Sequence, residues 1–320
     1  MKLFITHESA LSYWLGPYAR LRDASEAFDA LPSEPLSGFA IDPEDFERLG
    51  MVARPLHVSV ASPDQRNKRR DCRCHLMGGC IPEGAFMPIK GDIWVASPEL
   101  AFCQAAETKS LAELVKLGYE LCASFRINEF TEDTETREPL TDSVRLLDFC
   151  NRFDGLGAKW ARTAARYVRG GAESPMEIAL AMMLTLPQMY GGYGLPLAEP
   201  NREISIVKRG DRRITYRYRG DLVWQKQKVI AEYDSNLHHR APRKISEDAI
   251  RRNNLQDAGW RVVTVTWEQI RTTSGTDTVA DQLARALGVR NRYNPKEAAA
   301  RRIGLRAMLF PWAFPGFEGF

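Results

Sequence analysis

Three carboxylates in the second half of the chain have spacings that could build a metal site. Asp221 lies in an expected strand over 213–224, and Glu232 and Asp234 lie in the next expected strand, 228–234. Pairing of the two strands as a hairpin would bring Asp221 near Glu232, and alternation places Glu232 and Asp234 on one face. Such carboxylates repel one another unless a cation joins them. The sequence therefore predicts a site in which Asp221 and Glu232 bind Mg²⁺, with Mn²⁺ as a substitute.

Basic residues surround these acids. Residues 1–150 carry 16 Lys and Arg against 24 Asp and Glu, whereas residues 151–320 carry 28 against 17. A basic half suggests a polyanionic partner. A divalent ion among the acids can activate water and stabilise charge on a phosphate oxygen, while arginines hold a nucleic-acid backbone. The expected DNA contacts are Arg213, Arg217, Arg219, Arg251 and Arg252.

Three further side chains are candidates for catalysis, and each also has a structural explanation. Ser174-x-x-Glu177 is a capping box, so Glu177 is either a helix cap or a helper acid. His238 is either a general base or phosphate contact, or a residue of a surface turn. Lys228 could orient the attacking water, with Lys226, His238 and His239 as alternatives for that role. The acids themselves could instead be solvated strand ends or ion-pair partners.

The order of elements in the second half indicates an α/β fold with a mixed sheet. We expect 187–200, with its three glycines, to be a loop. The expected helices cover 174–186, 244–257, 277–287 and 295–308, and the expected strands cover 213–224, 228–234 and 261–267.

The first half reads as a smaller α+β domain. Short strands are expected at 3–6, 56–60 and 91–96, and helices after Ser97 and over 110–122. We expect an acidic domain over 1–143, a helical linker over 144–171 and a basic domain over 172–320. The aromatic segment 310–317 is expected to dock on a core or on a partner, including a second copy of the chain.

Several classes of protein are excluded or disfavoured. No apolar run reaches the roughly 18 residues of a membrane span, and the first apolar stretch breaks too early for a signal peptide. Six cysteines are too few for a disulfide scaffold. Phosphate-binding, dinucleotide-binding and nucleophile-elbow motifs are absent from the sequence. We expect a cytoplasmic protein without a membrane partner.

A family resemblance rests on several segments of the basic half, namely Ser174–Glu177, Asp221–Trp224, Val229–Asp234, His238, Asp248–Arg251, Leu255 and Gly259–Val263. With these, residues from about 172 to 290 resemble a Vsr-like (very-short-patch-repair-like) endonuclease domain of the PD-(D/E)XK superfamily. The resemblance implies a restriction-endonuclease-like mixed sheet flanked by helices. It also implies a Mg²⁺-dependent phosphodiesterase in which Asp221 and Glu232 are ligands and Glu177 is a helper acid. Asp234 stands where many relatives have Lys, and Ser235 where they often have Gly.

A second resemblance concerns the acidic half. Residues 92–102 are similar to the middle of AbiEi-like antitoxin proteins of type IV toxin–antitoxin systems, where such a segment accompanies a DNA-binding or regulatory domain. Because an acidic half binds DNA poorly, we assign it to specificity, dimerisation or partner contact.

The sequence thus favours a Mg²⁺-dependent DNA endonuclease linked to defence, repair or toxin–antitoxin systems. The alternative is a catalytically inactive nuclease fold that binds DNA as a regulator or antitoxin-like protein. A third hypothesis is a purely protein-binding role through the acidic half and the aromatic tail.

Overall fold

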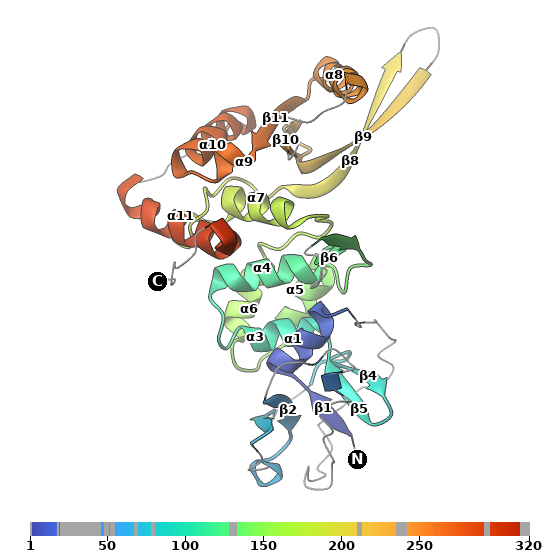
Figure 1. Cartoon of the computed structure of the whole chain (residues 1–320), viewed down its shortest axis with the longest axis vertical. Helices are drawn as coiled ribbons and strands as arrows, with labels where there is room; N and C mark the ends of the chain where they lie inside the picture. The colour runs from blue at the N-terminus through green and yellow to red at the C-terminus, as the bar shows by residue number, and fades with distance from the viewer. Residues whose placement is uncertain are drawn as a thin grey trace. The chain divides into compact units, whose positions relative to one another are not determined.

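The chain forms two compact units, Met1–Val168 and Arg169–Phe320, each built from helices and a sheet (Figure 1). The computed structural model describes residues 2–17, 19, 46–47, 51, 55–66, 70–77, 81–127, 133–209, 213–234, 242–290 and 295–313. Within these ranges it describes no side chains at 208–209, 213–214, 242–246 and 295–297. The predicted α/β class is confirmed. No described helix has the length and hydropathy needed to span a membrane.

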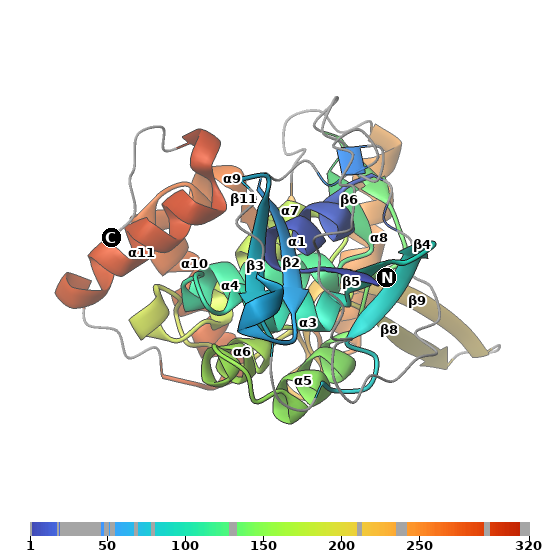
Figure 2. The same cartoon turned by 90° about the horizontal axis from the view of Figure 1, so that it is seen from below.

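The first unit is built on a five-stranded sheet with the order β3-β2-β1-β5-β4. Its central strand β1 runs parallel to β5 and antiparallel to β2, and all its residues are buried, as a strand covered on both faces requires. Helix α1 (His7–Leu15) packs against β2 and β5 (Figure 2). The strands are β1 (Leu3–Ile5), β2 (Leu56–Val60), β3 (Cys72–Leu76), β4 (Phe86–Lys90) and β5 (Ile93–Ala96).

Four more helices are described in the first unit, and they include most of the segment that we expected to be a linker. Helices α5 and α6 lie within 143–165 and so occupy most of 144–171, yet they pack on α3 and α4 and belong to the first unit. Their apolar faces, centred on Leu146, Phe149 and Ala161, are buried there. The elements are α3 (Pro98–Ala105), α4 (Leu111–Leu121), α5 (Ser143–Arg152), α6 (Ala158–Ala165), the hairpin β6 (Phe125–Ile127) and β7 (Thr134–Thr136), and the short 3₁₀ helix Pro63–Gln65.

The second unit contains a four-stranded mixed sheet with the order β11-β10-β9-β8. Strands β8, β9 and β10 are antiparallel neighbours, whereas β11 runs parallel to β10 after the crossover through α8. The predicted order of helix, strands, helix, strand and helices is confirmed. The elements are α7 (Pro175–Thr185), β8 (Glu199–Arg209), β9 (Arg213–Trp224), β10 (Val229–Asp234), α8 (Pro242–Asp257), β11 (Arg261–Thr266), α9 (Trp267–Ile270), α10 (Thr273–Leu287) and α11 (Pro295–Leu309), with short 3₁₀ turns at Gln188–Tyr190 and Pro311–Ala313.

The aromatic tail begins in the core of its own unit. Phe310 is fully buried, and its ring meets Trp267 edge-on at 5.2 Å and Trp312 at 5.5 Å between ring centroids. The ring of Trp312 is largely exposed. The expected docking therefore holds for Phe310, while 314–317 lie outside the described residues.

Three of the five histidines of the chain meet in the first unit. His75 Nε2 lies 3.2 Å from His57 Nδ1, and the His7 ring stacks on the His75 ring at 3.5 Å. Burial is the largest cause that lowers the pKa of both His57 and His75, followed by the charge of His7; the pKa of His75 falls to about 3. The unit therefore holds the rings of His57 and His75 neutral.

This cluster predicts an acid sensitivity of the first unit. An unfolded histidine binds a proton near pH 6.5, whereas folded His75 does not until about pH 3. The stabilising contribution is thus complete above pH 6.5 and declines as pH falls below it. We expect the free energy of unfolding, measured by urea titration between pH 7.5 and 5, to fall less steeply in His75→Gln than in the wild type. Cys74→Ser, on the same strand, should keep the wild-type slope, and an equal slope for His75→Gln would contradict the prediction.

Candidate functional site

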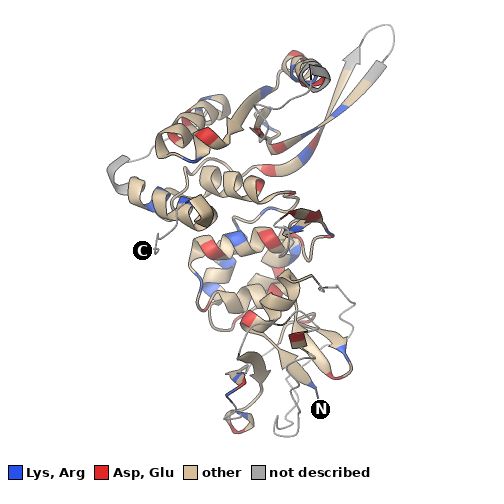
Figure 3. Cartoon of the chain, in the orientation of Figure 1, with Lys and Arg blue, Asp and Glu red and all other residues tan. Residues whose placement is uncertain are grey.

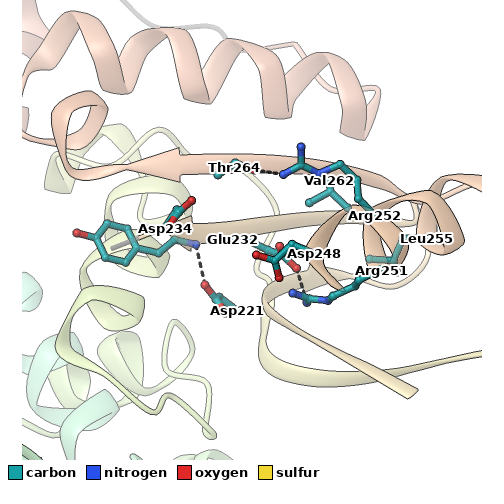
Figure 4. A pocket seen from close by; sticks show the side chains of 10 residues that line it. Asp221, Glu232, Asp234, Asp248, Arg251, Arg252, Leu255, Val262 and Thr264 are labelled. Atoms are coloured by element: carbon teal, nitrogen blue, oxygen red, sulfur yellow. Dashed lines mark hydrogen bonds and ion pairs between the residues drawn. The ribbon is translucent and has the colours of Figure 1, made fainter. Parts of the chain in front are cut away.

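The pairing of β9 with β10 brings Asp221 and Glu232 together. The register joins Ile230 to Val223 and Ala231 to Leu222, so the next positions along the two strands are Glu232 and Asp221. The backbone N–H of Tyr233 donates to Asp221 Oδ2 at 2.7 Å. Figure 4 shows Asp221, Glu232, Asp234 and Asp248 around one pocket. The two predicted metal ligands are therefore neighbours in space.

Strand β9 is tightly packed just before Asp221. A Cβ on Gly220 would lie 2.6 Å from Cγ2 of Ile230 and 2.9 Å from Cγ2 of Val223, closer than real side chains approach. Opposite Asp221 on β8, Asn201 has a φ of 49°, in the left-handed region that Asn tolerates better than most residues. The tight packing at Gly220 and the left-handed backbone at Asn201 fix the position of Asp221 on β9.

Glu177 has the structural role that its capping box predicts, and it also lies within electrostatic reach of Asp221. Its backbone N–H donates to Ser174 Oγ at 3.2 Å, and its carboxylate accepts from Ser174 Oγ at 2.9 Å and from the N–H of Glu173 at 2.8 Å. Asn201 Nδ2 donates to the same carboxylate. Helix α7 and strand β8 together hold Glu177 in a fixed orientation.

The pKa of two of these acids is raised. Burial is the main cause for Asp221, and the charges of Glu232 and Glu173 add to it, while the Tyr233 N–H and Arg251 act in the opposite direction. Burial also raises the pKa of Glu177, with a contribution from Asp221, against the hydrogen bonds that its carboxylate accepts. Asp221 lines the pocket and Glu177 lies within electrostatic reach of it, and a carboxyl group with a perturbed pKa in a pocket marks a candidate functional site.

Helix α8 supplies the positive charge of the pocket. Arg251 Nη2 donates to Glu232 Oε1 at 2.5 Å and also to the carbonyl of Arg219, and its guanidinium lies 6.0 Å from the ring centre of Tyr218. Arg252 Nη2 lies 3.5 Å from Thr264 Oγ1 on β11. Both arginines were predicted DNA contacts, and both line the pocket.

Asp248 and Asn201 were not among the predicted site residues. Asp248 lines the pocket one helical turn before Arg251, and the i, i+3 spacing of these two residues on α8 was the available signal. Asn201 has no comparable signal, since β8 was not predicted. Its place beside Glu177 follows only from the register of β8 on β9.

The other predicted site residues are elsewhere or outside the described part of the chain. Lys228 lies in the turn before β10, where its Nζ donates to the Ala258 carbonyl at 3.0 Å. Glu232 lies four positions further along the chain, about 13 Å at the rise of a strand, so the expected role of Lys228 in the site is corrected. The side chain of Arg213 and all of His238 lie outside the described residues.

Arg217 and Arg219 lie on β9 before the acids. The side chain of Arg217 is 74% exposed, with Nε 3.7 Å from Glu203 Oε1. Arg219 donates to the Asn201 carbonyl at 2.9 Å and pairs with Glu173. Both are thus positioned outside the pocket, on the strand that leads into it.

The donors of the pocket suit a hard cation with few protein ligands. Among the described residues, no group of three or more His, Cys, Asp or Glu side chains is arranged to hold a metal ion. Mg²⁺, however, commonly binds through one or two carboxylates and keeps several waters. The pair Asp221 and Glu232 fits that requirement, provided that Arg251 leaves Glu232.

Comparison with known proteins found similarity over part of the chain. Two proteins of Mycobacterium tuberculosis, Uncharacterized protein Rv2248 from strain ATCC 25618 / H37Rv and Uncharacterized protein MT2308 from strain CDC 1551 / Oshkosh, are each 29% identical over 127 residues. The alignment covers 40% of this chain and 42% of each relative. No family model and no solved structure matches the chain.

The packing at Gly220 predicts a large effect of one added methyl group. Gly220→Ala should destabilise the second unit by about 1–3 kcal/mol, because the new Cβ overlaps Ile230 and Val223. The measurement is the free energy of unfolding by urea. Gly304→Ala is the matched control, since nothing lies within 4 Å of its Cβ in helix α11 and the helix should gain about 0.5–1 kcal/mol. Equal effects of the two substitutions would contradict the close approach.

The raised pKa of Asp221 predicts that its charge opposes folding. A folded pKa above the unfolded value means that stability is lost as pH rises through the folded pKa. Asp221→Asn should therefore stabilise the protein at pH 7.5, and the gain should shrink as pH falls toward 4.5. The gain is measured as the difference in thermal unfolding temperature between Asp221→Asn and the wild type from pH 4.5 to 7.5. Asp148→Asn, at an exposed position on α5, is the control that should show no such gain.

Proposed function

We propose that the second unit is a Mg²⁺-dependent DNA endonuclease of the Vsr-like PD-(D/E)XK type. The observation that carries the proposal is the convergence of Asp221 and Glu232 in a pocket that Arg251 and Arg252 border. The mixed sheet with helices α7, α8 and α10 against it agrees with the fold that the family resemblance implies. The charge of the unit, 24 Lys and Arg against 16 Asp and Glu, suits a polyanionic substrate.

In this proposal Arg251 has two alternative partners. Its guanidinium now neutralises Glu232, in a pocket where the carboxylates would otherwise repel one another. An incoming DNA phosphate offers a stronger bidentate partner for the same guanidinium. Transfer of Arg251 from Glu232 to the phosphate frees the carboxylate for a cation at the moment when substrate arrives.

The remaining side chains have distinct tasks. Asp221 and Glu232 hold the cation, and the Tyr233 N–H orients the Asp221 carboxylate. Asp234 or Asp248 can accept the proton of the attacking water, because both carboxylates line the same pocket. Arg252 and Arg251 bind phosphate oxygens. A bound Mg²⁺ would supply positive charge to the scissile phosphate and promote attack by water.

A second function is favoured by one observation. No Lys lines the pocket among the described residues, and Lys228 is bonded to the Ala258 carbonyl instead. A pocket whose ion pair is permanent would bind DNA without cutting it. The protein would then be a nuclease-fold DNA-binding regulator or an antitoxin-like component, with the acidic first unit as the contact for a protein partner.

A cytoplasmic setting belongs to the same proposal. The described cysteines are all free thiols, as a reducing compartment requires.

The test is cleavage of supercoiled plasmid DNA by the full chain with Mg²⁺, Mn²⁺ or a chelator. We expect metal-dependent nicking that falls about 100-fold or more in Asp221→Asn and in Glu232→Gln, since loss of even indirect metal partners costs 10–100-fold. Asp148→Asn is the control at an exposed carboxylate of the first unit.

Two results would decide against this assignment. Nicking that persists in both variants would place the activity elsewhere. Salt-sensitive DNA binding without nicking by the wild type would favour the regulator.

A further inference from the structure

Strands β8 and β9 form a ribbon that extends beyond the sheet. Strand β9 pairs with β10 only from Leu222 to Trp224, but the β8–β9 ladder continues outward to Arg209 opposite Arg213. Figure 1 shows this hairpin projecting past β10 and β11. From Gly220 outward the chain is thus a two-stranded antiparallel ribbon without a third strand on either side among the described residues.

The ribbon is strongly basic. Residues 202–219 contain seven Lys and Arg against two Asp and Glu. Ile204 and Ile206 are buried in the cluster that includes Leu255 of α8, so one side of the ribbon base is anchored. Ser205, Val207, Thr215 and Arg217 are exposed, and Figure 3 shows basic positions along the ribbon. The described part of the ribbon therefore combines a fixed base with an exposed polar side.

We propose that this ribbon enters the major groove of duplex DNA and places the Asp221–Glu232 pocket on a phosphate beside that groove. The inference rests on the proposed function in taking DNA as the partner. The major groove of B-form DNA, about 12 Å wide, admits a two-stranded ribbon, whereas the major groove of A-form RNA is too narrow and deep for side chains to read. The excess of arginines matches both phosphates and guanine edges.

Strand β9 carries both the ribbon residues and Asp221, so it sets the distance between the DNA contacts of the ribbon and the pocket. Asp221 lies eight residues after Arg213 on β9, about 27 Å at the rise of an antiparallel strand. Since one base pair advances the duplex by about 3.4 Å, the attacked phosphate lies about 8 base pairs or less from the base pairs reached by the described part of the ribbon. A ribbon fixed to the sheet at Gly220 and α8 would transmit that spacing without a hinge.

The experiment measures binding of the full chain to a labelled 30-base-pair duplex by fluorescence anisotropy, with a chelator so that no cleavage occurs. Four ligands are compared: unmodified DNA, the same duplex with glucosylated hydroxymethylcytosines that fill the major groove, the same duplex with a minor-groove ligand bound, and duplex RNA. We expect at least about tenfold weaker binding to the glucosylated DNA and to the RNA, and unchanged binding with the minor groove filled.

Substitutions in the ribbon test whether its arginines make the contacts with DNA. Arg217→Ala and Arg219→Ala, both at exposed positions of the ribbon, should each weaken binding and reduce the salt dependence by about one phosphate contact. Arg152→Ala, an exposed position of the first unit, should not change either quantity. Circular dichroism checks that the variants fold.

The outcomes separate this inference from the nuclease assignment. Major-groove-dependent binding by a protein that never cleaves supports the ribbon and rejects the nuclease. Cleavage by the wild type with binding that ignores the glucosyl groups and the ribbon variants rejects the ribbon alone. Equal binding to duplex RNA, competition by the minor-groove ligand, or no duplex binding at all would also overturn the inference.

Discussion

Repulsion between half-buried carboxylates is the constraint on which the second unit depends. Asp221 lies within electrostatic reach of both Glu232 and Glu177, and burial raises the pKa of Asp221 and of Glu177. The structure offsets this with Arg251 on Glu232, the Tyr233 N–H on Asp221, and the helix cap with Asn201 on Glu177. A fold that only needed stability could place apolar residues here at less cost. In the function that we propose, these acids bind a cation.

Three features of the backbone position these side chains. The β9–β10 register places the two acids as neighbours, and the close approach at Gly220 fixes the point where Asp221 leaves the strand. The crossover through α8 then returns over the sheet and brings Arg251 to Glu232. In the histidine cluster of the first unit, burial likewise disfavours charge. There His57 and His75 stay neutral, whereas the acids of the second unit are paired with a counter-ion or hydrogen-bond donors.

Local patterns were sufficient for much of the fold. Strand-like runs predicted β9, β10 and β11, apolar spacing predicted α4, and Ser97 and Ser174 marked helix starts correctly because N-caps act within one turn. Strand β8 was missed, since its Pro200 and polar residues resemble a loop and only Ile204 and Ile206 face the core. The roles of Asn201, Arg251 and Lys228 depend on long-range register, which periodicity does not specify. The segment 144–171 resembled a linker because its contacts lie far away in sequence.

The most direct test of the account is a Mn²⁺ titration followed by electron paramagnetic resonance, because it measures the shared cation without requiring DNA or cleavage. We predict one bound ion per chain in the wild type, weaker or absent binding in Asp221→Asn and Glu232→Gln, and tighter binding in Arg251→Met, where the competing guanidinium is gone. Glu177→Gln should retain the ion, because its carboxylate is already engaged by Ser174, Glu173 and Asn201. Absence of Mn²⁺ binding even in Arg251→Met, or binding indifferent to Asp221 and Glu232, would contradict the account.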